Sequence, residues 1–273
     1  MLIGNREYDV RNKTYLLGIL NITPDSFSDG GKHNSLDKAL FRVEDMIEEG
    51  ADIIDIGGES TRPGCAPVDK EEELARIIPV LEGIKSRFDI PISIDTYKAL
   101  VAKTCIEAGA DMINDIGGLQ KDDKMAAVIA NSNVPCVLMH NRDSDIYECF
   151  EKEFKDDIKR MLDIARAEGI KKEKIILDAG IGFPKNYEQN MFLMANPSIL
   201  NDFSYPMLLG TSRKSFIGQA LELPVDKRLE GTLTTTVLAV LAGYSFVRVH
   251  DIKENRRTID MTDRIMGFRV SHA

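Results

Sequence analysis

The sequence predicts an α/β fold, a (β/α)8 TIM barrel, and three observations lead to this prediction. The chain has 273 residues, close to the ~250 that are typical of this fold. Short apolar runs rich in Ile, Val and Leu alternate with longer segments of helical period, as strands and covering helices do around a parallel sheet. Eight such runs can be counted, which matches the strand number of this barrel. We therefore expect one barrel domain over residues 1–273.

The expected strands are apolar along most of their length, as a sheet covered on both faces requires. They cover residues 15–21, 52–58, 91–96, 112–116, 135–140, 174–180, 206–212 and 246–251. The segments 36–49, 71–87, 98–108, 150–168 and 229–242 are amphipathic and long enough to be crossover helices. Before the first strand, LIGNREYDVRN at residues 2–12 predicts a short hairpin with its turn near Gly4, capping the bottom of the barrel.

An open, doubly wound sheet is the alternative arrangement of alternating strands and helices. It predicts a glycine-rich phosphate turn after the first strand. Here the first strand ends in NITPD at residues 21–25, and no G-x-G-x-x-G occurs in the chain. The closed barrel is therefore the better interpretation.

Charge and cysteine content exclude several classes of protein. Lys plus Arg number 35 and Asp plus Glu 44, so the net charge of −9 disfavours binding to nucleic acid or to an anionic membrane. The four cysteines, Cys65, Cys105, Cys136 and Cys149, have neither C-x-x-C spacing nor the density of a disulfide scaffold. No run of about 18 apolar residues occurs, and the N-terminal segment is charged. We expect a cytoplasmic protein with small-molecule partners.

Polar residues follow the expected strands, at the end of the barrel where active sites of this fold lie. In chain order they are Asn21, Glu59 to Arg62, Asp95 with Thr96, Asn114 with Asp115, His140, Asp178, Ser212 to Lys214, and Arg248 with His250 and Asp251. Two long exit segments, 22–35 and 59–69, contain Gly and Pro and are typical of functional loops.

Each of these residues also has an ordinary structural interpretation. Asp95 or Asp115 taken alone could be the N-cap of the next helix, and His140 is more simply a buried histidine than a catalytic one. Asp178 is followed by AGIG, which does not resemble the start of a helix, so its carboxylate is expected to face the barrel mouth. The convergence of all eight exits is the stronger argument for a site.

The chemistry of these residues suggests a ligand with two different ends. Asp95, Asn114, Asp178 and Lys214 offer acceptors and donors suited to the edges of a flat heterocycle. Ser60, Thr61, Arg62, Arg248 and His250 are hydroxylic or basic and suit phosphate oxygens. Asn21, near Asp25, could hold Mg²⁺ through oxygen ligands and substrate phosphates.

Seven motifs at these exits resemble the dihydropteroate synthases, in the order of that family and along nearly the whole chain. They are GILNITPDSFSDGG at 18–31, ESTRPG at 59–64, SIDT at 93–96, NDIGG at 114–118, LDAGIGF at 177–183, GTSRKSF at 210–216 and RVHD at 248–251. The family pattern is LDPGIGFGK at the sixth exit, where this chain has Ala179 and Pro184, and Asn141 stands where methionine is common. These differences concern the backbone after the sixth strand.

The resemblance implies a transferase of folate biosynthesis, sensitive to sulfonamides and active as a homodimer. In its reaction, 6-hydroxymethyl-7,8-dihydropterin pyrophosphate condenses with p-aminobenzoate. By this resemblance, the pterin would be bound by Asp95, Asn114, Asp178 and Lys214, and the pyrophosphate by Thr61, Arg62, Arg248 and His250. Asn21 would bind Mg²⁺, and p-aminobenzoate would be bound by Phe27, Pro63, Phe183 and Ser212.

The resemblance also suggests a dissociative mechanism, which needs no strong base because the aromatic amine is neutral near pH 7. Mg²⁺, Arg62, Arg248 and His250 would stabilise the leaving pyrophosphate, while Asp95 would stabilise the pterin-methyl cation. Asp95, Arg248, His250 and Lys214 are the expected catalytic residues.

Three other functions compete with this interpretation. A corrinoid-dependent methyltetrahydrofolate methyltransferase would share the barrel and the pterin residues, but it needs neither ESTRPG nor RVHD. A Schiff-base aldolase would use Lys214, expected in that case inside a strand. A catalytically inactive barrel that binds pterin for an interaction role is the third alternative, and a turnover assay with the pterin pyrophosphate would separate it from the enzyme.

Overall fold

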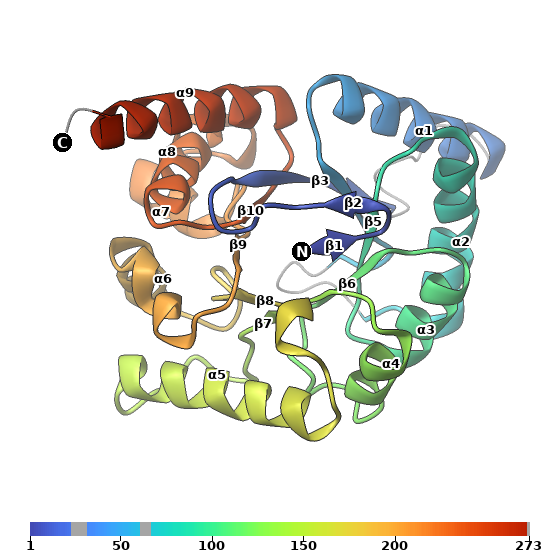
Figure 1. The fold of residues 1–273 in the computed structure, drawn as a ribbon, viewed down its shortest axis with the longest axis horizontal. Helices are drawn as coiled ribbons and strands as arrows, with labels where there is room; N and C mark the ends of the chain where they lie inside the picture. The colour runs from blue at the N-terminus through green and yellow to red at the C-terminus, as the bar shows by residue number, and fades with distance from the viewer. Residues whose placement is uncertain (23–31, 61–66, 272–273) are drawn as a thin grey trace.

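The structure is a computed structural model, and it describes residues 1–22, 32–60 and 67–271. Within this part of the chain, eight parallel strands form a closed barrel in the order β10-β3-β4-β5-β6-β7-β8-β9 (Figure 1). The strands are β3 (Tyr15–Asn21), β4 (Ile53–Gly57), β5 (Ile92–Asp95), β6 (Met112–Asp115), β7 (Cys136–Met139), β8 (Ile175–Asp178), β9 (Met207–Leu209) and β10 (Phe246–Val249). Each lies inside a segment that the sequence predicted as a strand, so the TIM-barrel prediction is confirmed.

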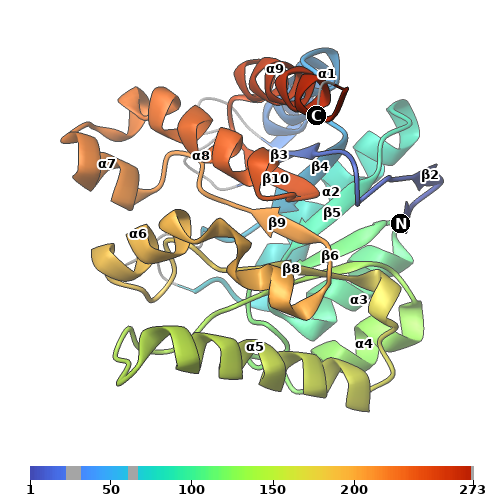
Figure 2. The ribbon, with the colours of Figure 1, turned by 60° about the vertical axis from the view of Figure 1, so that its left-hand side comes forward.

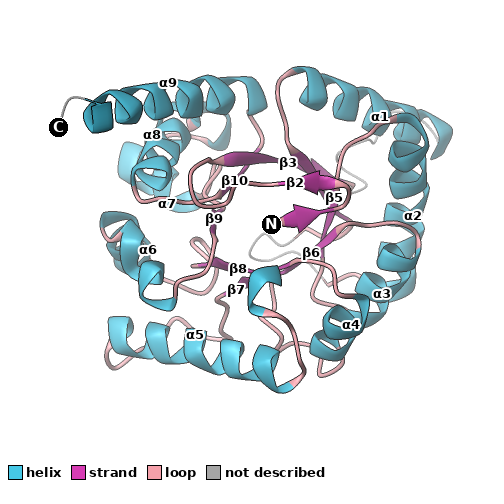
Figure 3. Ribbon diagram, in the orientation of Figure 1, coloured by secondary structure: helices cyan, strands magenta, loops and turns pink. Residues whose placement is uncertain are grey.

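Helices follow the strands and form the outer ring of the molecule (Figure 3). They are α1 (Lys32–Glu48), α2 (Lys70–Arg87), α3 (Ala99–Glu107), α4 (Met125–Ser132), α5 (Phe150–Ala167), α6 (Tyr187–Ala195), α7 (Ser215–Leu221), α8 (Leu229–Leu241) and α9 (Ile252–Ser271). The first begins at Lys32, earlier than the expected residue 36. Among the described helices, none combines the length and apolarity that a bilayer crossing requires.

The barrel strands alternate between two apolar surfaces, because successive side chains of a strand point to opposite faces. Outward residues such as Leu16 and Ile54 pack in the large core between the sheet and the helices. The inward residues at the start of the strands form a second cluster inside the barrel: Leu17, Ile53, Met112, Val137, Ile176, Leu208 and Phe246. The interior is therefore filled at its N-terminal end.

The predicted N-terminal hairpin is present and closes this end of the barrel. Its strands β1 (Leu2–Ile3) and β2 (Arg6–Glu7) pair antiparallel and lie across the ring of strands in Figure 1. Ile3 and Tyr8 are buried in the interior cluster, and the Tyr8 hydroxyl donates a hydrogen bond to the Asp52 carbonyl at 3.0 Å. In side view the hairpin lies at one end of the molecule (Figure 2).

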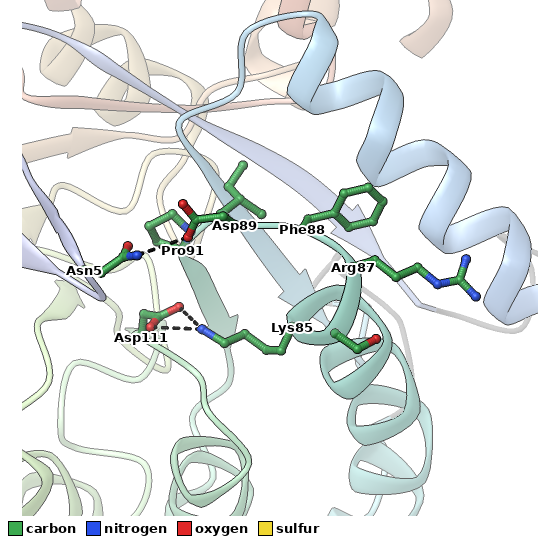
Figure 4. Close-up of a pocket in the computed structure, with 9 residues that line it drawn as sticks. Asn5, Lys85, Arg87, Phe88, Asp89, Pro91 and Asp111 are labelled. Atoms are coloured by element: carbon green, nitrogen blue, oxygen red, sulfur yellow. Dashed lines mark hydrogen bonds and ion pairs between the residues drawn. The ribbon is translucent and has the colours of Figure 1, made fainter.

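A cavity of about 450 Å³ lies beside the hairpin, at the N-terminal end of β5 and β6 (Figure 4). Several of its charged and polar groups are partnered within the protein. Asn5 donates to Asp89 at 3.1 Å, and Lys85 forms an ion pair with Asp111 at 3.1 Å. The same Asp111 carboxylate accepts from the Ile92 amide at 2.8 Å. The Asn5 contact ties the hairpin turn to the barrel, at the end opposite to the strand exits.

Candidate active site

A cluster of charged side chains occupies the interior of the barrel above the apolar layer. The Arg248 guanidinium of β10 donates from Nε to Asp55 Oδ2 of β4 and from Nη2 to Asp95 Oδ2 of β5, both at 2.5 Å. Asn114 of β6 donates to the same Asp55 oxygen at 3.3 Å. One cation therefore links two carboxylates across the barrel.

The strand period explains why these residues meet. Ile53 and Asp55 lie two residues apart in β4, as do Phe246 and Arg248 in β10, so each pair faces the interior. The inward faces of β4 and β10 thus change from apolar to polar along the strand. Sequence reasoning missed Asp55, which is fully buried; its signal was one carboxylate inside the apolar run IIDIG.

Asp178 and Lys214 border the same cluster from β8 and from the start of α7. A Cβ atom at Gly210 would lie 3.6 Å from Asp178 Oδ2 and 4.0 Å from Arg248 Cβ. A methyl group at this position would therefore be in van der Waals contact with both side chains. Lys214 donates from Nζ to the Ile181 carbonyl.

Phe183 and Ser212 complete the described part of this region. The Lys214 ammonium lies over the Phe183 ring, 4.9 Å from its centroid. Ser212 is buried, and its hydroxyl is hydrogen-bonded to Nδ1 of His250 at 3.0 Å and accepts from the His250 amide at 3.2 Å. The exits of β9 and β10 are therefore joined through these two residues.

Asn21 lies at the end of β3, beside Gly57 of β4 in the strand register. A Cβ atom at Gly57 would lie 3.5 Å from Asn21 Oδ1 and 3.8 Å from Asp95 Oδ2, so an amide and a carboxylate oxygen flank this glycine. Within the described residues, no group of three or more His, Cys, Asp or Glu side chains could hold a metal ion. The oxygen donors here are few.

The structure thus brings together, at one end of the barrel, most of the site residues expected from the sequence. They are Asn21, Asp95, Asn114, Asp178, Phe183, Ser212, Lys214, Arg248 and His250. Four further expected residues, Phe27, Thr61, Arg62 and Pro63, lie outside the described ranges.

Burial shifts the ionisation of these groups strongly. Desolvation raises the pKa of Asp95 to about 7, although the Arg248 cation opposes the shift. Burial also raises the pKa of Asp178, against the Lys214 cation, and lowers the pKa of Lys214 to about 8. Burial acts to lower the pKa of Arg248, but Asp55 and Asp95 outweigh it and raise that pKa. The guanidinium therefore stays charged.

Three buried oxygens make no hydrogen bond with any described group: Asp55 Oδ1 and Asp95 Oδ1 of this cluster, and Ser93 Oγ of β5, which lies opposite Asp55 in the strand register. Buried polar atoms in proteins are nearly always partnered, and leaving one unpaired costs about 1–3 kcal/mol. Two of the three are carboxylate oxygens, which only accept. A polar ligand that carries N–H donors would satisfy them.

Two residues flagged in the sequence have structural roles instead. His140 is buried, lies 3.2 Å from Asp157 Oδ2 through Nε2, and packs on the Phe154 ring at 4.6 Å. Burial lowers the pKa of His140 to about 4. Asp115 accepts from the amides of Gly117 at 2.8 Å and Leu119 at 2.6 Å, so it holds the turn after β6.

Comparisons with known proteins relate this barrel to others of known activity. A family model described as pterin binding enzyme matches residues 17–250. The dihydropteroate synthase of Clostridium beijerinckii is 55% identical over 267 residues, covering 97% of this chain and 99% of that protein. The structure of the Clostridium difficile dihydropteroate synthase, obtained in the presence of pteroic acid, has a TM-score of 0.92 at 51% identity and covers 95% of this chain and 99% of its own. The Yersinia pestis enzyme with a sulfonamide drug complex has a TM-score of 0.90 at 39% identity, with 98% of both chains covered.

Proposed function

The chain belongs to the pterin-binding enzyme family, and on this premise we propose how its barrel mouth carries out the dihydropteroate synthase reaction. The amine nitrogen of p-aminobenzoate forms a bond to the methylene carbon of 6-hydroxymethyl-7,8-dihydropterin pyrophosphate. The carbon–oxygen bond to pyrophosphate breaks, pyrophosphate leaves with the bonding electron pair, and the amine loses a proton. The observation that carries the proposal is the buried cluster of Asp55, Asp95, Asn114 and Arg248, with carboxylate oxygens still able to accept.

We assign the pterin ring to Asp95, Asn114, Asp178 and Lys214. The two carboxylates and the amide oxygen can accept from ring N–H and amino groups, while the amide nitrogen and the ammonium can donate to ring nitrogen and oxygen atoms. Asp95 and Asp178 are both buried, so their charges act at low dielectric on cationic character at the pterin methylene. This arrangement favours departure of the leaving group before the amine bond is complete.

Arg248 is assigned to the pyrophosphate. A guanidinium has five N–H donors, and the contacts with Asp55 and Asp95 use two of them. The same contacts fix the plane of the side chain, so further donors are preorganised toward an incoming anion. His250, two residues after Arg248 and just past the end of β10, is assigned to the pyrophosphate together with Thr61 and Arg62.

For the metal ion we propose Mg²⁺ at Asn21. The Asn21 Oδ1 atom lies beside Gly57 at the end of β3, and Mg²⁺ prefers oxygen ligands, with few protein groups and the substrate phosphates. The residues present therefore fit the ion, which when bound would neutralise charge on the pyrophosphate. Asp25, the other nearby carboxylate in the sequence, lies outside the described residues.

The p-aminobenzoate pocket is assigned to Phe183 and Ser212, with Phe27 and Pro63 from the loops. Phe183 offers an apolar face, and the Ser212 hydroxyl lies close to a histidine and can donate to a carboxylate. A sulfonamide drug is bound in the related Yersinia pestis structure, and sulfonamides have the aminophenyl shape of p-aminobenzoate. We propose that they inhibit this chain by competing with p-aminobenzoate.

The reaction itself is the test of this assignment. Purified protein is incubated with the pterin pyrophosphate, p-aminobenzoate and Mg²⁺, and dihydropteroate is detected by mass. We expect product that depends on both substrates, with one pyrophosphate released per dihydropteroate. Methyl transfer from methyltetrahydrofolate, or borohydride trapping of a carbonyl compound on Lys214, without dihydropteroate would contradict the proposal and support a methyltransferase or an aldolase.

We propose further that the enzyme is a cytoplasmic homodimer. Leu241 of α8 and Met261 and Ile265 of α9 are apolar side chains about half exposed on adjacent helices, and such a surface favours a subunit contact. Cys105 and Cys136 are free thiols, as in proteins of a reducing compartment. Light scattering of the eluted protein should give twice the chain mass, and a monomer at micromolar concentration would contradict the dimer.

A further inference from the structure

The loop that follows β8 contacts two of the residues assigned above and contains a third. It runs over residues 179–186, between Asp178 and the start of α6 at Tyr187. Asp178 Oδ1 accepts from the Gly180 amide at 2.7 Å, and the Ile181 carbonyl accepts from Lys214. Phe183 belongs to the loop itself. The position of this loop therefore fixes two of the pterin residues relative to each other.

A buried lysine ties the loop to the neighbouring strand. Lys185 is only 8% exposed, and its ammonium donates to the Gly180 carbonyl at 2.9 Å and to the His140 carbonyl, just after β7, at 3.4 Å. The loop crosses this strand end closely: Gly180 has a φ of +65°, and a Cβ atom there would lie 2.0 Å from the His140 carbonyl oxygen. Lys185 thus connects the exits of β7 and β8.

Asn190 of α6 holds the second half of the same loop. It is buried, its Oδ1 accepts from the Gly182 amide at 2.7 Å, and its Nδ2 donates to the Lys185 carbonyl at 2.9 Å and the Asn186 carbonyl at 2.8 Å. The loop is therefore fixed at both ends by side chains that lie outside the assigned ligand contacts.

We propose that Lys185 is a positioning residue of the pterin site: its buried ammonium holds the β8 exit loop against the end of β7 and so sets the positions of Asp178 and Lys214. The proposal rests on the proposed function, because it concerns the same bound ring. Lys185 acts through these two residues and is not assigned a contact with substrate.

The energetics of Lys185 argue for function over stability. The charged groups around it are Asp178 and Asp157, which favour its cation, and Lys214 and Arg142, which oppose it. Desolvation is the largest effect and lowers the pKa of Lys185 to about 7. A buried charge held mainly by neutral carbonyls is costly to a fold, and an apolar side chain of similar volume is often neutral or stabilising. Its cation also favours the ionised form of Asp178.

The test compares Lys185→Met, Lys185→Gln and Lys185→Arg with the wild-type enzyme. Thermal unfolding reports stability, and calorimetry reports the Kd of pteroate between pH 5 and 8. We expect Lys185→Met to keep its unfolding temperature within a few degrees but to bind pteroate about tenfold or more weakly, since small misplacements of a site are costly. Lys85→Met, which removes an ion-paired lysine at the opposite end of the barrel, is the matched control and should bind pteroate normally.

The pH dependence of pteroate binding shows whether Lys185 acts through its charge or only by filling space. Without the Lys185 cation the pKa of Asp178 rises further. The fall in pteroate affinity on acidification, the acid limb of the pH profile, should therefore occur at a higher pH in Lys185→Met than in the wild type. Lys185→Arg keeps the charge and should keep the acid limb near its wild-type position. If Lys185→Met does not fold, Lys185→Gln makes the same comparison, because it removes the charge and retains N–H donors.

Two results have distinct meanings. A neutral variant that folds and binds pteroate like the wild type, with the acid limb unmoved, would overturn the role of Lys185 while leaving the proposed function intact. A wild-type protein that does not bind pteroate would overturn the proposed function, and this inference with it.

Discussion

Replacement of Arg248 by methionine should expose the electrostatic balance of the barrel interior. The change leaves Asp55 and Asp95 in the barrel without the cation that both contact at 2.5 Å. Removing one partner of a buried ion pair costs about 3–5 kcal/mol, and here two carboxylates lose the same partner. We expect the free energy of unfolding to fall by about this amount at pH 8.

The loss of unfolding free energy in Arg248→Met should be smaller at acid pH, because Asp95 is then protonated. Burial raises the pKa of Asp95 to about 7 even with Arg248 present, and in the variant this pKa rises further. Below it the carboxyl is protonated and needs no cation, so the difference in stability between wild type and Arg248→Met grows as the pH rises through about 7.

Urea denaturation at pH 5.5 and pH 8 measures this difference. Arg256→Met is the matched control, because Arg256 pairs with Asp52 outside the barrel, where both side chains are about one quarter exposed. Arg256→Met should lower the free energy of unfolding by about 1 kcal/mol or less, and by a similar amount at both pH values. An Arg248→Met cost that equals the control, or that does not change with pH, would refute the reasoning.

Three further predictions concern the pterin site. Asp95→Asn should lower kcat about 100-fold or more in a pyrophosphate-release assay, because it removes a charge that acts on the transition state; near-normal turnover would contradict this role. Gly210→Ala should raise the KM for the pterin pyrophosphate with little change in unfolding temperature, because the new methyl group enters the space between Asp178 and Arg248; an unchanged KM would show that the ring does not use this space. Pteroate affinity should fall as the pH rises through about 8, where Lys214 loses its proton, and Lys214→Arg should move this limb to higher pH; an unmoved limb would assign it to another group.

Much of the architecture could be predicted because the determining pattern is local. Each strand of the barrel is a short, mainly apolar run, and the polar residues at or near its end stand out, as at Asp178 in β8 and Arg248 in β10. The position of a strand's end then places its side chain at the mouth. The number of strands follows from the count of these runs, and closure into a barrel of parallel strands places them in chain order.

The parts that sequence reasoning missed depend on contacts between distant segments. Asp55 belongs to the interior of a strand, and its role appears only when the strand register places it beside Arg248. Lys185 and Asn190 lie in a loop and a helix, where a polar residue is ordinarily exposed, so their burial could not be anticipated. The start of α1 at Lys32 was missed because KHNS is a weak helical sequence.

A crystal structure with bound pteroate tests the central claim most directly. We expect the pterin ring at the C-terminal end of the barrel, within hydrogen-bonding distance of Asp95, Asn114 and Asp178, with the Asp95 Oδ1 atom accepting from the ring. A ring bound elsewhere, for example in the cavity lined by Lys85 and Asp111 at the opposite end, would contradict it.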